Sequence, residues 1–138
     1  VNDLAVGAAY DDTESDGTKS SNPNWNAGAI HIMFMNTDAS VKSTVEINDS
    51  TTNGPELSQS DYFGYSIENI GDLDGNGVND LAVGAINDNA GGTDRGAIHI
   101  MFMNTDASVK STVEINDSTA PLLMIQEAKI VVQYTSFT

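Results

Sequence analysis

Apolar and polar residues alternate along several short stretches of the chain, and a period of two residues is typical of β-strands. The clearest example is AIHIMFM at residues 29–35, in which Ile30, Ile32 and Phe34 fall on one side. The other side carries alanine, histidine and methionine, so both sides are largely apolar. This pattern favours a strand that packs between two sheets.

The chain also contains an internal repeat. Residues 28–51 recur unchanged as residues 96–119, and VNDLAVGA occurs at both 1–8 and 78–85. The connection between the two repeated blocks is longer in the first copy, and in both copies it is rich in Asp, Asn and Gly. A connection that tolerates such an insertion is typical of an exposed loop between two strands.

Together, the alternation and the repeat predict an all-β fold. The second copy is expected to form four short strands, at roughly residues 62–70, 80–85, 97–103 and 112–116. Four strands that follow one another directly form one antiparallel sheet. The first copy is expected to contain only the last three of these strands, because the chain begins after the point at which its first strand would end.

Composition narrows the possible partners. The chain of 138 residues has 20 Asp and Glu against 5 Lys and Arg, for a formal net charge of -15. This charge repels phosphate backbones and anionic lipids, so we expect neither nucleic acid nor membrane insertion, and it favours cations. The absence of cysteine excludes disulfides, thiolate metal sites and cysteine nucleophiles.

The candidate chemistry lies in the acidic stretch GDLDGNGVNDLAVGA, which begins at residue 71. Side-chain oxygens occur at Asp72, Asp74, Asn76 and Asp80, which are positions 1, 3, 5 and 9 of a loop, and Val78 offers a backbone carbonyl at position 7. Alternate ligands on a tightly turning loop can converge on one point, and glycines permit the positive φ angles of such a turn. Calcium requires about six to eight oxygen ligands. The loop is therefore a candidate Ca²⁺ site.

The loop differs from an EF-hand in its second half. Its twelfth position is Val83 where an EF-hand has a bidentate Glu, and its flanks are predicted strands where an EF-hand has helices. The alternative is an Asp- and Gly-rich hairpin turn whose acids are merely solvated. Acids at alternate positions favour the calcium loop, because a plain turn does not need them.

These features resemble an FG-GAP repeat, the unit of the integrin alpha-subunit β-propeller and of many bacterial and archaeal surface proteins. The resemblance rests on the Phe63-Gly64 pair, the DLDGNGVND loop and the AVGA strand, which follow one another in the family's order. It implies propeller blades of four antiparallel strands. It also implies that Ca²⁺ binds in the loop between the first and second strands, with the oxygen ligands Asp72, Asp74, Asn76, Val78 and Asp80.

The resemblance divides the chain into three parts. Residues 1–60 are expected to form a first blade that lacks its first strand and keeps only Val1 and Asp3 of the calcium loop. Residues 61–119 are expected to form a complete second blade. Residues 120–138 are unrelated to the repeat, and three interpretations stay open: they supply the missing strand, they cover a sheet edge, or they result from a shifted reading frame.

Two blades do not close a ring. Propellers usually have four to eight blades, because each blade buries its faces against its neighbours. Exposure of the open faces of a two-blade unit would forgo about 1.5 to 3 kcal/mol for each large apolar side chain. We therefore expect the chain to be part of a longer propeller or to complete a ring with copies of itself.

The functional expectation is a calcium-binding extracellular or cell-surface module for adhesion or protein interaction, in which calcium is structural. No catalytic residue is expected, and His31 and His99 are interpreted as structural positions because they recur in identical strands. The alternative function is an accessory carbohydrate-binding module of a polysaccharide-degrading protein, with Trp25 stacking on a sugar ring. Asn48 and Asn116 lie in N-glycosylation sequons.

Overall fold

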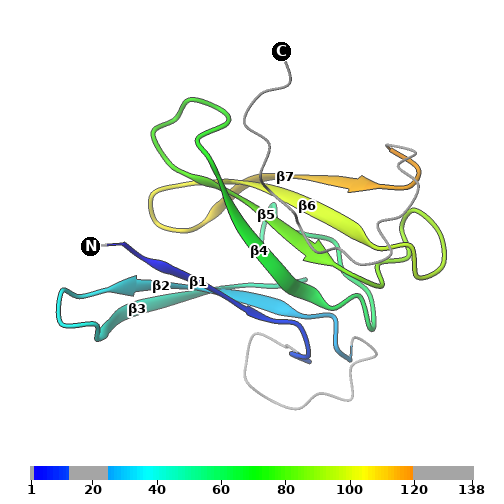
Figure 1. The fold of residues 1–138 in the computed structure, drawn as a ribbon, viewed down its shortest axis with the longest axis horizontal. Helices are drawn as coiled ribbons and strands as arrows, with labels where there is room; N and C mark the ends of the chain where they lie inside the picture. Colours follow the sequence, from blue (N-terminus) through cyan, green and yellow to red (C-terminus); the bar gives the residue numbers. More distant parts are fainter. Residues whose placement is uncertain (1, 13–24, 120–138) are drawn as a thin grey trace.

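The described part of the chain, residues 2–12 and 25–119 of a computed structural model, contains seven strands and no helix. The strands form two antiparallel sheets, in which each strand pairs with the next one along the chain (Figure 1). The first sheet contains β1 (Leu4–Ala8), β2 (Ala29–Met35) and β3 (Val41–Ile47). The second sheet contains β4 (Phe63–Gly71), β5 (Asp80–Ala85), β6 (Ala97–Met103) and β7 (Val109–Asn116). The all-β fold with blade-like sheets of three and four strands is therefore confirmed.

The predicted strand boundaries are close to the observed ones except at β7, which begins at Val109 and not at residue 112. The reason is the tight hairpin NTDAS, which precedes both β7 and β3. In this hairpin the N–H of Asn104 donates to the carbonyl of Ser108 at 2.9 Å, and Ala107 has a φ of 64°. Because the turn is short, β7 can pair with β6 immediately after it. Residues 120–138, for which three interpretations were open, lie outside the described residues.

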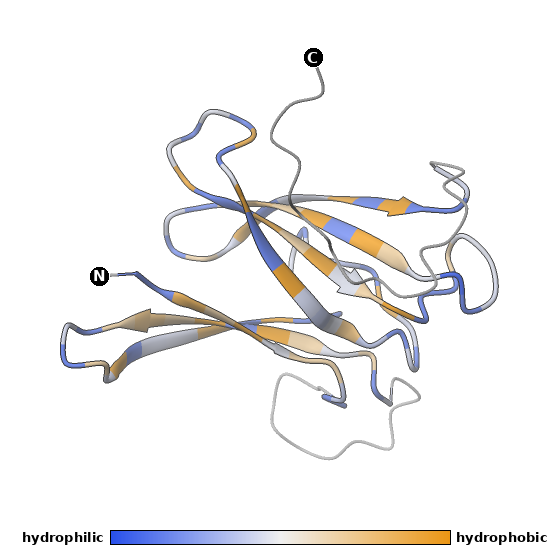
Figure 2. Cartoon of the chain, in the orientation of Figure 1, coloured by the Kyte–Doolittle hydropathy of each residue, from blue (hydrophilic) through white to orange (hydrophobic). Residues whose placement is uncertain are grey.

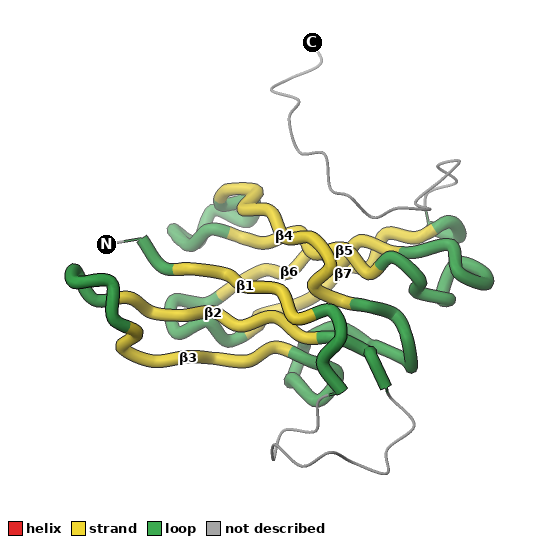
Figure 3. The backbone as a smooth tube through the Cα atoms, turned by 60° about the horizontal axis from the view of Figure 1, so that its bottom comes forward, coloured by secondary structure: helices red, strands yellow, loops and turns green. Residues whose placement is uncertain are grey.

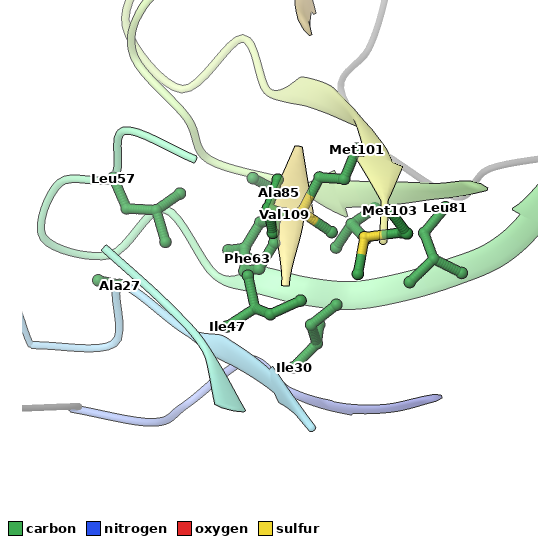
Figure 4. Packing of buried hydrophobic residues seen from close by; sticks show 11 residues of the cluster. Ala27, Ile30, Ile47, Leu57, Phe63, Leu81, Ala85, Met101, Met103 and Val109 are labelled. Carbon is green, nitrogen blue, oxygen red and sulfur yellow. The ribbon is translucent and has the colours of Figure 1, made fainter. Parts of the chain in front are cut away.

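The two sheets pack face to face, with β1 and β2 of the first sheet against β4 of the second (Figures 1 and 3). The hydropathy colouring of Figure 2 shows apolar residues on every strand, as expected if both faces of a sheet are to be covered. Figure 4 shows how the core fills the space between the sheets: Ile30 and Ile47 of the first sheet point toward Phe63 and Met103 of the second. The core therefore lies between the sheets.

Backbone contacts between glycines bring the sheets close together. A Cβ atom at Gly7 in β1 would lie 1.9 Å from the carbonyl oxygen of Gly64 in β4. A Cβ atom at Gly64 would in turn lie 2.4 Å from the carbonyl oxygen of Ala29, and Gly64 has a φ of +88°. Only glycine satisfies both the spacing and the backbone angle here. The glycine of the Phe63-Gly64 pair therefore packs on the first sheet's VGA strand.

Candidate metal centre

The acidic loop connects β4 to β5 and winds around the carboxylate of Asp72. This carboxylate accepts hydrogen bonds from the backbone N–H groups of Gly75, Asn76 and Gly77, at 2.8, 3.0 and 2.8 Å. Gly75 and Gly77 have φ angles of 75° and 86°, which the turn requires and which L-residues rarely adopt. The sequence thus folds the loop locally, through one acid at its first position and two glycines.

The loop brings three of the predicted ligands together. Asp72, Asp74 and Asp80 each offer a carboxylate oxygen, and these oxygens lie within 4.8 Å of one another. Asp72 and Asp74 are exposed, whereas Asp80 is buried. The predicted convergence of alternate acids is therefore present.

Asp80 anchors the loop to the second sheet. Its carboxylate accepts a hydrogen bond from the N–H of Leu73 at 2.8 Å and another from the N–H of Met103 at 3.0 Å. Asn76 adds a second anchor, because its side-chain amide donates to the carbonyl of Met103 at 3.0 Å. The loop consequently lies against the end of β6, beside the hairpin that leads to β7 (Figure 1).

The remaining two predicted ligands, Asn76 and Val78, are not tested by this geometry. The side-chain oxygen of Asn76 accepts a hydrogen bond from the N–H of Val78 at 2.8 Å, which places both residues in the same turn. Their role as ligands stays a prediction.

Among the described residues, a single lysine faces the three carboxylates. The ammonium of Lys110, in β7, lies 2.6 Å from a carboxylate oxygen of Asp74. This hydrogen bond lowers the pKa of Asp74 below its usual value. One positive charge does not balance three carboxylates, so a cation in the loop would be attracted electrostatically.

The donor chemistry of the loop fits a hard cation. All three clustered ligands are carboxylates, and the loop contains no histidine and no cysteine. Calcium and magnesium bind such oxygen ligands, whereas softer metals prefer nitrogen or sulfur. The loop therefore contains acidic groups that could hold a metal ion.

In the first copy, Asp3 is the equivalent of Asp80. Asp3 accepts a hydrogen bond from the N–H of Met35 at 3.0 Å, as Asp80 does from Met103 in the second copy. Asp3 and Asp80 therefore accept the same backbone hydrogen bond in the two sheets.

A second polar cluster lies at the opposite end of the second sheet, and sequence reasoning missed it. A ring nitrogen of His99 in β6, Nε2, lies 3.2 Å from a carboxylate oxygen of Asp88, which follows β5. Glu114 in β7 pairs with His99 across the strands, and one ligand atom from each of the three residues lies within 4.8 Å of the others. The sequence did contain one indication of this cluster. Asp11 and Asp88 lie at the same position after the two copies of VNDLAVGA.

Asp61 lies near this second cluster and is almost fully buried. One of its carboxylate oxygens accepts a hydrogen bond from the N–H of Ser58 at 2.6 Å, and the other has no partner among the described residues. Burial raises the pKa of Asp61 to about 7, and the negative charges of Asp88 and Glu114 add to this effect.

The two sequon asparagines point inward. Asn48 and Asn116 are 4% and 6% exposed, and the side-chain amide of each donates a hydrogen bond to the glutamate two residues before it, Glu46 or Glu114. In this fold neither nitrogen is accessible to a glycosylating enzyme. Trp25, in contrast, is 58% exposed.

Comparison with curated proteins found no match to the chain. The described residues contain no helix that is long and apolar enough to cross a membrane. The family model of the FG-GAP repeat matches residues 63–101, which run from the Phe63-Gly64 pair through the acidic loop and β5 into β6. This part of the chain, with its FG pair, its acidic loop and its paired strands, is therefore similar to an FG-GAP repeat.

Proposed function

We propose that the acidic loop binds Ca²⁺ and that the chain is part of a calcium-stabilised β-propeller used for adhesion or protein interaction outside the cell or at its surface. FG-GAP repeats suggest a β-propeller-like protein-interaction module, are often calcium-binding and are typically non-catalytic. They are typical of extracellular or surface proteins. The observation that carries the proposal is the convergence of Asp72, Asp74 and Asp80 in one loop.

Bound calcium would have a structural role. The ligands proposed are the side-chain oxygens of Asp72, Asp74, Asn76 and Asp80 with the carbonyl of Val78. The positive charge of the ion offsets the repulsion among the carboxylates. The anchors from Asp80 and Asn76 to Met103 then transmit the stabilisation of the loop to β6. An ion that binds the folded chain alone stabilises it by mass action.

Thermal unfolding with and without calcium tests this proposal. We expect the Tm of the chelator-treated chain to rise when CaCl₂ is added, and the Asp72→Asn variant to lose most of this rise. Asp38→Asn is the matched control, because Asp38 is an exposed acid in the hairpin of the other sheet, where its carboxylate accepts hydrogen bonds from Ser40. A Tm that is indifferent to calcium, or an equal loss in both variants, would contradict the proposal.

We also propose that another blade covers the open face of the first sheet, from a longer propeller or from a second copy of the chain. Support comes from β1, in which Leu4 and Val6 are 49% and 40% exposed. Three copies with two blades each would give a ring of six. The native mass in calcium is expected to be that of a defined oligomer, and a monomer with a cooperative melt would rule out self-assembly.

A carbohydrate-binding module is the second candidate function, and the exposed indole of Trp25 favours it. Aromatic side chains with an exposed face can stack on sugar rings. Quenching of the fluorescence of Trp25, the single tryptophan, by oligosaccharides would support this function. Unchanged fluorescence together with binding to a protein ligand would support the adhesion module.

A further inference from the structure

The cluster of Asp88, His99 and Glu114 is built by three different elements of the second sheet. Asp88 lies directly after β5, His99 lies within β6, and Glu114 lies opposite His99 in β7. The carbonyl of Asp88 accepts a hydrogen bond from the N–H of Gly96 at 2.9 Å, which closes the connection between β5 and β6. The backbone therefore holds the three side chains together.

Two of the three side chains of this cluster are shielded from water, whereas Glu114 is partly exposed. The side chains of His99 and Asp88 are 1% and 3% exposed. The ring of Phe63 packs edge-on against the imidazole of His99, with 5.4 Å between the ring centroids. The acidic loop at the other end of the sheet differs in this respect, since two of its three acids are exposed.

Two buried polar atoms at the cluster have no hydrogen-bond partner among the described residues: Nδ1 of His99 and one carboxylate oxygen of Asp61. Asp61 itself is 2% exposed, and its carboxyl group is influenced by the charges of Asp88, His99 and Glu114. Buried polar atoms almost always have a partner, so the unpartnered oxygen of Asp61 beside the cluster indicates a missing group.

The charged residues at the cluster indicate whether the missing group is a cation or an anion. Asp61, Asp88 and Glu114 bring three carboxyl groups to one imidazole, so acidic groups outnumber basic ones at the cluster. The basic side chains in ion pairs of the described residues lie elsewhere, with Lys110 on Asp74 and Arg95 on Asp117. A buried excess of negative charge is costly, and a bound cation relieves it.

We propose that Asp88, His99 and Glu114 form a second metal site, largely buried at one end of the second sheet, for a divalent transition-metal ion of the zinc class. One imidazole nitrogen and two carboxylate oxygens are ligands that Zn²⁺ accepts, whereas the all-oxygen acidic loop suits calcium. Ligand atoms on one tetrahedral Zn²⁺ ion lie about 3.3 Å apart. The 3.2 Å between His99 Nε2 and the Asp88 carboxylate matches this spacing. Water bound to the ion can donate to the unpartnered oxygen of Asp61.

The first copy repeats the same three residue types in a looser arrangement. His31 Nε2 lies 3.8 Å from a carboxylate oxygen of Asp11, and Glu46 pairs with His31 across the strands. The side chains of His31 and Asp11 are 25% and 31% exposed. Because exposed ligands are hydrated and less well positioned, this copy is a weaker site and provides an internal control.

The test is a Zn²⁺ titration of the full chain by calorimetry, after chelation and with excess Ca²⁺ present to saturate the acidic loop. We expect one tight Zn²⁺ per chain. His99→Gln should weaken this binding by at least about a hundredfold, since even partners outside the ligand set contribute about 10- to 100-fold. His31→Gln, the same substitution in an identical strand, should leave it unchanged.

Two further measurements separate loss of binding from loss of folding. Co²⁺ added to the unmutated chain should give the visible absorption of a four-coordinate site, and Zn²⁺ should abolish that absorption. Glu114→Gln, at a partly exposed position, should weaken Zn²⁺ binding with an unchanged circular dichroism spectrum. The absence of Zn²⁺ binding and of the Co²⁺ bands, or equal losses in the His31 and His99 variants, would overturn the proposal.

The acidic loop provides the remaining control. Asp72→Asn should abolish the effect of calcium and leave Zn²⁺ binding intact, because Asp72 lies at the opposite end of the second sheet. Loss of Zn²⁺ binding in this variant would place the Zn²⁺ in the acidic loop and overturn the proposal. The two metal proposals can therefore fail independently.

Discussion

Strands β2 and β6 have the same sequence, AIHIMFM, and pair with their neighbours in the same register, yet their burial differs. In β6 the side that carries His99 and Met101 is buried. In β2 the side that carries His31 is only half-buried. The identical residues are therefore in different environments, and what differs is the presence of a neighbouring sheet.

The strands next to them show the same contrast. Val83 in β5 is fully buried, whereas the equivalent Val6 in β1 is 40% exposed. On the opposite face of the strands, the first copy is the more buried one. Ile30 in β2 is fully buried, whereas its counterpart Ile98 in β6 is half-buried. The more buried face of each sheet is thus the one that faces the other sheet, although β5 is buried on both faces. The local sequence therefore determines which strands of a blade pair, whereas the neighbouring blade determines how much of each strand is buried.

The largest expected difference between the two copies is the loss of stability when an equivalent leucine is replaced by alanine. Leu81 in β5 is 9% exposed and belongs to the core, whereas Leu4 in β1 is 49% exposed. Leu81→Ala should lower the free energy of unfolding by about 3 kcal/mol, the usual range for a buried leucine being about 2 to 5. Leu4→Ala should cost less than about 1 kcal/mol. Urea unfolding of both variants measures the difference, and equal losses would show that β1 is covered in solution.

The next comparison is between the effects of Asp61 and Asp11 on the pH dependence of stability. Burial raises the pKa of Asp61 from its usual 3.8 to about 7. Between these values the folded chain holds a proton that the unfolded chain has lost. The free energy of unfolding therefore falls as pH rises through this window, by at most about 1.4 kcal/mol per pH unit.

Asp61→Asn should flatten this slope in chelator-treated protein. Burial also raises the pKa of Asp11 in the first copy, but that carboxylate is partly exposed, so Asp11→Asn should change the slope less. Urea midpoints between pH 4 and pH 7.5 provide the measurement. A slope in the Asp61→Asn variant as steep as that of the unmutated chain would assign the pH dependence to other groups.

The smallest expected effect concerns the two equivalent lysines. Lys110 binds Asp74 in the acidic loop, so Lys110→Ala should free that carboxylate and raise the affinity for Ca²⁺ a few-fold. Lys42→Ala makes the same change in the first sheet, away from any complete loop, and should leave the affinity unchanged. Calcium titration by calorimetry compares the two. A lower affinity in the Lys110 variant would mean that the lysine helps to position the loop.

Much of the fold could be predicted from local patterns. The alternation in AIHIMFM gave the strands, and the acids around Gly75 and Gly77 gave the loop, because both depend on residues that are close in sequence. The second polar cluster could not be found in this way. Asp88 lies in a polar connection that resembles any solvated loop, and only the packing of Asp61 and His99 around it makes it buried.

The close approach of Gly7 to Gly64 has a consequence for how such chains can grow. The second repeat carries the FG pair and the first repeat carries the VGA strand that it fits, so the two halves of this junction come from consecutive repeats. Tandem duplication of one unit in the gene therefore creates a new junction that already fits. Such a chain can lengthen by whole units with no further mutation at the contact, whereas a deletion within a unit leaves two halves that do not match.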